Sequence, residues 1–191
     1  MAFFIVLTVA ASSQSTPEPY AVKSDKLGES ITQWKVNNPR LDDCRNSTIG
    51  DRPGAASDPY VVYCSPRGAE EESLTYATAP LLTEIAWFYK SALYKVEMPL
   101  HSRARLSQVM TGLEEKFGAP SGRETTPFQN GLGARFEQEG LTWKNGVSTI
   151  EIVYSNSPGN APVLTFVLDA PDKEVTKRWK EADGSKARSD M

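Results

Sequence analysis

The sequence predicts an α+β fold in which helices pack on one face of an antiparallel sheet. Three observations predict it. Helical and strand periodicities follow one another in the order helix, strands, helix, strands, helix. Turn-forming residues separate the strand-like segments, and Asn145-Gly146 is the strongest two-residue hairpin signal among them. The strand-like segments are rich in aromatic residues, and a sheet with such a face needs a layer of helices to cover it.

The first half is expected to contain one helix and several strands. Ser24 or Asp25 caps the expected helix, which stops before Pro39 and carries Leu27, Ile31 and Trp34 on one face. Residues 60–64 are predicted to form a strand, and residues 74–78 are a further candidate.

A hairpin is expected next, with strands at residues 84–89 and 93–98 joined through Lys90-Ser91-Ala92. In the second strand, Tyr94, Val96 and Met98 alternate with Leu93, Lys95 and Glu97. This alternation predicts a strand with one buried face.

The second half begins with the clearest helix. Ser102 is its expected N-cap and Gly118 its C-terminal stop, with an apolar stripe of Leu106, Val109, Met110, Leu113 and Phe117. Strands are predicted at 147–154 and 163–168, and Asp169 and Pro171 open a last helix that carries Val175 and Trp179.

The order of elements suggests two tandem helix-plus-meander units. We expect the first at residues 24–100, with a disulfide hairpin, and the second at 101–183, with the C-terminal helix. Residues 184–191 form a polar tail that is expected to fray.

The N-terminus predicts export. Residues 2–11 are an uninterrupted apolar run, too short to span a bilayer but typical of a secretory signal peptide cleaved after Ala11. Residues 12–23 would then be a spacer. No Lys or Arg precedes the run, so either the true start lies upstream or the segment is a buried strand. We expect a secreted or periplasmic protein.

The two cysteines agree with that compartment. Cys44 and Cys64 flank a turn-rich segment and lie in or beside extended runs, so we expect them to face one another and to form a disulfide. Two buried free thiols are the alternative. A redox-active pair would prefer the C-x-x-C spacing, which the sequence lacks.

Composition argues against several classes of function. The formal net charge of −3 gives no electrostatic basis for nucleic-acid binding, and one His with two Cys leaves few ligands for zinc or copper. No cofactor is therefore expected. His101 is the only imidazole available as a base, and we interpret it as a connector residue. The acidic clusters, including Glu70–Glu72, Glu114–Glu115 and Glu137/Glu139, are interpreted as surface charges.

A resemblance rests on residues 106–143, where a helix ending in Phe117-Gly118-Ala119-Pro120 is followed by an extended arm and a tryptophan strand. This pattern resembles small exported bacterial α+β modules, namely the outer-membrane assembly lipoproteins of the SmpA/OmlA type and the β-lactamase-inhibitor-protein (BLIP-like) type. The resemblance implies helices on an antiparallel sheet and a role in binding another protein. The lipoprotein type carries a lipid-attachment cysteine, which this chain lacks.

The aromatic residues are the remaining candidates for function. Trp87-Phe88-Tyr89 makes both faces of its strand apolar, which is typical of a central, covered strand. The alternative is an exposed partner-binding face made of Tyr60, Tyr63, Tyr76, Trp87 and Tyr89, since aromatic residues dominate interface hot spots.

The sequence thus predicts an exported module without catalytic activity that binds an unidentified protein, in an inhibitor-like or assembly-accessory role. Two alternatives stay open: a cell-envelope hydrolase that uses carboxylates, and a carrier of small apolar ligands. No stable membrane insertion is expected.

Overall fold

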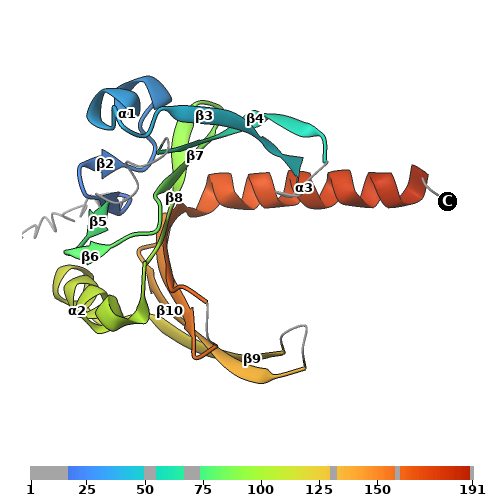
Figure 1. Cartoon of the computed structure of the whole chain (residues 1–191). Helices are drawn as coiled ribbons and strands as arrows, with labels where there is room; N and C mark the ends of the chain where they lie inside the picture. The colour runs from blue at the N-terminus through green and yellow to red at the C-terminus, as the bar shows by residue number, and fades with distance from the viewer. Residues whose placement is uncertain (1–16, 50–54, 67–73, 130–132, 158–159, 190–191) are drawn as a thin grey trace, which may run out of the picture.

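The structure is a computed structural model of the 191-residue chain (Figure 1). It describes residues 17–49, 55–66, 74–129, 133–157 and 160–189. The predicted signal peptide and the Glu70–Glu72 cluster lie outside these residues. No helix in the described part is long and apolar enough to cross a membrane.

Three helices and one large sheet make up the fold. The helices are α1 (Ile31–Asn37), α2 (Leu106–Phe117) and α3 (Asp169–Ser189), and a 3₁₀ turn, η3 (Arg103–Arg105), leads into α2. The sheet is antiparallel throughout and has the strand order β3-β4-β7-β8-β12-β11-β10-β9. Its strands are β3 (Asp43–Thr48), β4 (Ser57–Ser65), β7 (Ile85–Tyr89), β8 (Ala92–Pro99), β9 (Gly122–Gln129), β10 (Arg135–Lys144), β11 (Ser148–Ser155) and β12 (Val163–Leu168). Two small hairpins add β1 (Ala21–Val22) with β2 (Asp25–Lys26), and β5 (Thr75–Tyr76) with β6 (Ala79–Pro80).

The strand order contains two four-stranded meanders. β3-β4-β7-β8 follows α1, and β9-β10-β11-β12 follows α2. The last strands of the two meanders, β8 and β12, pair with one another, so both meanders share one continuous sheet. The predicted α+β class with an antiparallel sheet is confirmed.

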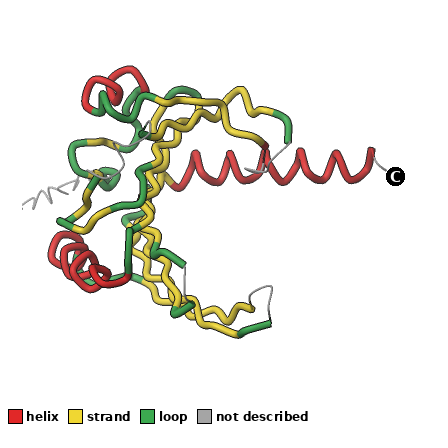
Figure 2. The backbone as a smooth tube through the Cα atoms, viewed as in Figure 1, coloured by secondary structure: helices red, strands yellow, loops and turns green. Residues whose placement is uncertain are grey.

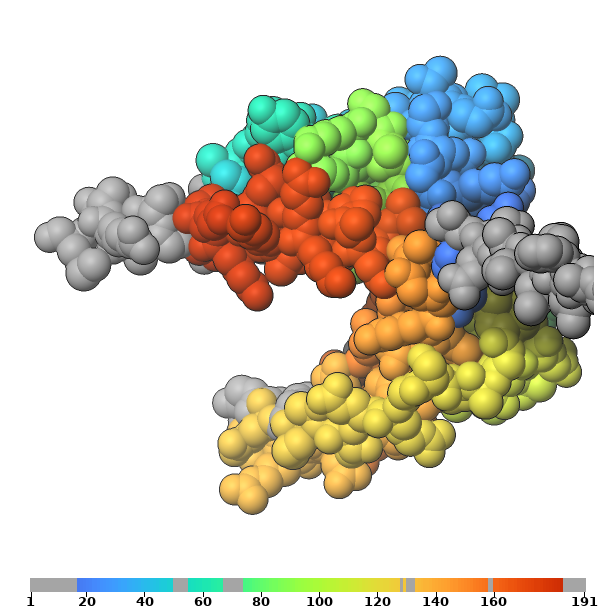
Figure 3. Space-filling model, turned by 180° about the vertical axis from the view of Figure 1, so that it is seen from behind, coloured from blue at the N-terminus to red at the C-terminus, as the bar shows by residue number. Residues whose placement is uncertain are grey.

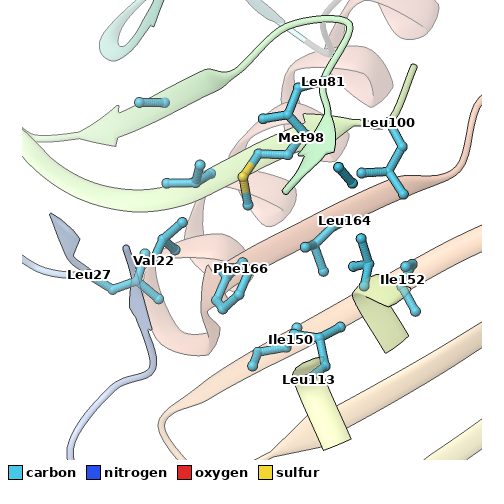
Figure 4. Close-up of a cluster of buried hydrophobic side chains, with 14 of the residues drawn as sticks. Val22, Leu27, Leu81, Met98, Leu100, Leu113, Ile150, Ile152, Leu164 and Phe166 are labelled. Atoms are coloured by element: carbon cyan, nitrogen blue, oxygen red, sulfur yellow. The ribbon is translucent and has the colours of Figure 1, made fainter. Parts of the chain in front are cut away.

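The main core lies between the convex face of the sheet and the helices α1 and α2. Trp34 of α1 and Leu113 of α2 are buried there against Phe88 and Phe166 of the sheet. Figure 4 shows how side chains from β8, β11 and β12 meet Leu113 and the N-terminal residues Val22 and Leu27. The apolar stripe predicted for α2 therefore faces the main core, as its helical periodicity indicates.

The prediction that the helices share one face of the sheet is wrong for α3. Figures 1 and 2 show a strongly curved sheet with α1 and α2 on its outer side and α3 inside the curve. Val175 and Trp179 of α3 belong to a second apolar cluster with Trp87 and Tyr94. The physical reason is that the central strands are apolar on both faces, and each face needs its own cover.

The first helix is shorter than predicted. Residues 21–26 form a hairpin, and α1 begins at Ile31, where the Ser30 side chain accepts a hydrogen bond from the Gln33 N–H (3.2 Å). Gly28 has a φ of 97°, a conformation that interrupts a helix. Asp25 is no cap, because its carboxylate accepts hydrogen bonds from the side chains of Trp34 and Asn38.

The alternation predicted for β8 is also modified. Trp87 pairs with Lys95, but its neighbour Phe88 pairs with Leu93, so Tyr94 is an extra residue in the strand. This bulge puts Leu93 on the convex side with Val96 and Met98, whereas Tyr94 joins the α3 cluster.

The predicted disulfide is confirmed. Cys44 of β3 and Cys64 of β4 are direct partners across the hairpin and are bonded to one another. Two boundaries differ from the predictions. Val22, assigned to the spacer, is fully buried, and α3 continues past Gly184 to Ser189.

Candidate functional site

The predicted aromatic face is only partly one surface. Tyr63 and Trp87 lie side by side with ring centroids 5.3 Å apart, and Tyr89 lies in the same cluster. Tyr76 lies on the opposite side of the sheet, where its ring is 5.9 Å from that of Phe166. Burial raises the pKa of Tyr76 to about 12.

Helix α3 covers this aromatic surface. Trp87 and Tyr89 are each only 5% exposed, so they are core residues rather than a free binding face. Tyr60, at the edge, is 49% exposed, and the Arg178 guanidinium of α3 lies 4.6 Å from its ring centroid. The interpretation of Trp87 and Tyr89 as covered strand residues is therefore confirmed, with α3 as the cover.

Polar contacts fix the position of α3. Asp58 of β4 is 1% exposed and accepts hydrogen bonds from the Trp179 indole N–H (2.9 Å) and the Arg178 guanidinium (3.3 Å). Glu174 accepts hydrogen bonds from the Tyr89 hydroxyl (2.6 Å) and from Lys90 (3.0 Å). The Tyr89 hydrogen bond, with help from Lys90, holds the pKa of the Glu174 carboxyl below its usual value.

Among the residues that the structure describes, α3 covers the first half of the concave face and leaves the second half open. Figure 3 shows a hollow between α3 and the strands of the second meander. We call this hollow the cleft. Its side wall is α3, and its floor is formed by the side chains of β10, β11 and β12 that point away from the main core.

A groove of about 310 Å³ lies where the floor meets α3. Five of its residues come from alternate positions of the strands: Thr142, Lys144, Thr149, Glu151 and Val167. Three come from the first turns of α3: Asp169, Asp172 and Lys173. The Thr149 hydroxyl donates a hydrogen bond to Asp169 (2.8 Å), which joins the floor to the base of the helix.

Two carboxyl groups in this groove have raised pKa values. Desolvation is the largest cause for Glu151, followed by repulsion from Glu124 and Asp172. Desolvation also raises the pKa of Asp172, where attraction by Lys95 opposes it and repulsion from Asp169 adds to it. Both carboxyl groups therefore hold a proton more tightly than an ordinary surface acid does.

The charges along the cleft are unequal in number. Acidic side chains on or beside the groove outnumber basic ones by two: Glu97, Glu124, Glu151, Asp169 and Asp172 against Lys95, Lys144 and Lys173. Lys95 and Glu97 are paired with one another (3.1 Å). Gly140 has no side chain on the floor of the cleft. A Cβ at this position would lie 3.9 Å from a Glu151 carboxylate oxygen, on the same face of the sheet.

Glu151 and Asp172 are not among the site residues that the sequence predicts. Glu151 lies on the face of β11 opposite to the buried Ile150 and Ile152. What the sequence could not show was that α3 would bring Asp172 to that same face. His101 is an exposed connector between β8 and η3, as interpreted, and its backbone N–H donates a hydrogen bond to the carbonyl of Pro80 (2.9 Å).

The described residues contain no group of three or more His, Cys, Asp or Glu side chains arranged to hold a metal ion. Comparison with protein-family models, with curated proteins and with solved structures found no match. The fold and the chemistry of the groove are therefore the basis for a proposal about function.

Proposed function

We propose that the protein is an exported binding module that contacts a partner protein through the cleft. The observation that carries this proposal is the half-open concave face: α3 covers the first meander, and the second meander presents a polar floor beside the helix (Figure 3). A concave surface of this shape contacts a protruding partner on two sides, so it can bury the area that a specific interface needs.

The charge of the cleft indicates what the partner presents. Glu151 and Asp172 have raised pKa values because they are partly desolvated next to other carboxylates. A Lys or Arg side chain entering the groove would relieve that repulsion, so we expect a partner with a basic protruding segment. Export is supported by the Cys44–Cys64 disulfide, since such bonds persist in oxidising compartments.

The experiment is site-specific photo-crosslinking. Benzoylphenylalanine replaces Lys144, an exposed groove residue, and a matched control replaces Val36, which is 71% exposed on α1. In an extract of the exporting compartment, the Lys144 probe should give a discrete adduct that the Val36 probe does not. Charge reversal by Glu151→Lys should weaken that adduct at least several-fold. Equal labelling from both positions, or an adduct insensitive to Glu151→Lys, would contradict the proposal.

A second candidate, a carboxylate-dependent envelope hydrolase, is favoured by one observation. A general acid needs a raised pKa, and Glu151 and Asp172 both have one within a single groove. Turnover of envelope polysaccharide that is lost in both Glu151→Gln and Asp172→Asn, but kept in Glu115→Gln on α2, would establish it. A carrier of apolar ligands has less support, because charged side chains line this groove.

A further inference from the structure

Among the described strands, β3 and β9 are the two edges of the eight-stranded sheet, and only β9 is regular. The register between β3 and β4 shifts between Asn46 and Thr48, and such a bulge discourages pairing with a further strand. β9 pairs with β10 without a shift from Gly122 to Gln129. Figure 1 shows β9 at the margin of the curved sheet, across the hollow from α3. Within the described chain β9 is paired on one side only, so its other side can accept a strand.

Two hydrogen bonds define which backbone groups of β9 face outward. The Asn145 N–H donates to the Ser148 carbonyl (3.2 Å), so the odd-numbered residues of β10 bond to β11. The Thr142 carbonyl accepts from the Ser121 N–H (2.7 Å), so the even-numbered residues of β10 bond to β9, where their partners are also even-numbered. Peptide groups alternate in direction along a strand. The odd-numbered residues of β9 therefore direct their N–H and C=O groups away from the sheet.

Pro127 agrees with this direction. It is an odd-numbered residue of β9, and it lacks the N–H that a position facing β10 would need. Its ring also interrupts the outward row of donors, which confines the available edge to residues 122–126. There Arg123 and Thr125 present backbone N–H and C=O groups that have no partner within the part of the chain that the structure describes.

The side chains beside this edge are acidic on the face of the cleft. Glu124 pairs with Gly140, so it lies on the floor side of the sheet, at the rim of the cleft. After desolvation, repulsion from Glu124 is the next cause of the raised pKa of Glu151, so the two carboxylates are near one another. Arg123 pairs with Leu141, a residue of the main core, and therefore lies on the other face. A strand added to β9 would meet negative charge on its cleft side.

We propose that an extended segment of the partner adds to β9 in the antiparallel sense, with a Lys or Arg side chain beside Glu124. Backbone hydrogen bonds to Arg123 and Thr125 supply affinity that depends little on sequence, and Glu124 selects the basic side chain. Because Gly140 has no side chain, the cation also approaches Glu151. This inference rests on the proposed function, since it specifies how the basic segment of the partner enters the cleft.

The probe is a capped peptide of about six residues in which lysine and valine alternate. In the proposed pairing its lysines lie on the face of Glu124, and its valines lie opposite Arg123 and Thr125 and direct their N–H groups at β9. Titrated into the ¹⁵N-labelled protein at constant ionic strength, it should give saturable amide shifts in residues 122–126 and none in 43–48 of β3. N-methylation of the valines should abolish this binding. N-methylation of the lysines, whose N–H groups face away, is the matched control and should change the dissociation constant less than about twofold.

Substitutions test the protein side of the contact. Thr125→Pro removes an outward N–H and should raise the dissociation constant of the lysine peptide about tenfold, whereas Thr125→Val keeps the N–H and should leave it within about twofold. Glu124→Gln should raise the constant about fivefold, and Glu115→Gln, at an exposed position of α2, is the matched control for charge and should not. Pro127 already occupies an outward position of the same strand, so Thr125→Pro should fold, and an unchanged melting temperature checks this. The methylated peptides test the unaltered chain in any case.

Equal binding by the two methylated peptides, or by a peptide in which glutamate replaces lysine, would overturn the proposal, because pairing through the backbone or selection by charge would then be absent. Shifts that do not saturate, or that are as large on β3, would also overturn it. A photo-adduct from position 144 that survives Thr125→Pro unchanged would keep the cleft as a binding site and overturn strand addition alone. Peptide binding with the expected pattern, but without that adduct, would overturn the proposed partner and support β9 as a strand-binding edge.

Discussion

Asp58 links β4 to α3, and replacing it by alanine tests how α3 is held. The carboxylate is buried and accepts hydrogen bonds from Trp179 and Arg178 of α3, as well as from the backbone N–H of Tyr60 (3.0 Å). Asp58→Ala leaves the Trp179 N–H and the Arg178 guanidinium without this acceptor. Within the described part of the chain, the Arg178 Nε is already buried without a hydrogen-bond partner, so this guanidinium has few other contacts to replace the lost one.

The expected cost follows from these contacts. A buried donor left without a partner costs about 1–3 kcal/mol, and we take about 2 kcal/mol for the indole N–H. The Arg178 side chain is 37% exposed, so water replaces part of its lost contact and its share is about 1 kcal/mol. The sum of about 3 kcal/mol corresponds to a fall of roughly 6–12 °C in the melting temperature for a domain of this size.

Urea unfolding and amide hydrogen exchange measure the two parts of this prediction. The free energy of unfolding should fall by about 3 kcal/mol, and α3 amides should lose protection before those of β11 and β12. Trp179→Phe removes the N–H donor alone, and its coupling with Asp58→Ala should be about 1–2 kcal/mol. A loss below about 0.5 kcal/mol, which is the size expected for the exposed control Val36→Ala, would refute the reasoning.

Three further predictions concern the disulfide, the groove and a turn. Replacing Cys44 and Cys64 by serine should cost about 3 kcal/mol in urea unfolding, since the bond closes a separation of 20 residues; a loss below 1 kcal/mol would count against this. The pKa of Glu151 is higher in the folded than in the unfolded state, so its ionisation destabilises the fold as the pH rises above about 4. Glu151→Gln should therefore raise the melting temperature at pH 7 and have less effect at pH 4, and a stabilisation of equal size at both pH values would contradict this. Gly146 has a φ of 91° with open space around it, so Gly146→Ala should cost about 1 kcal/mol from backbone strain alone, measured by thermal unfolding; a neutral result would show that the turn relaxes.

Local patterns were sufficient to predict much of the fold. The stripe of Leu106, Val109 and Leu113 is buried as its helical spacing indicates, and β11 forms over the segment predicted as a strand at 147–154. These predictions succeed because the periods of helix and strand are properties of the backbone itself. The candidate site was predicted less well, because Trp87 and Tyr89 are covered by a helix more than eighty residues further along the chain.

By itself, the sequence determined where β4, β7, β8, β11, β12, α2 and α3 form, which side of most of them is apolar, and that the two cysteines lie opposite one another. The tertiary structure decided that β8 pairs with β12, that a bulge turns Tyr94 to the concave side, and that α3 lies inside the curved sheet. The physical reason is the range of the interactions. Periodicity and turn chemistry act over a few residues, whereas the pairing of two meanders and the covering of a sheet face depend on apolar surfaces that meet only after the chain has folded.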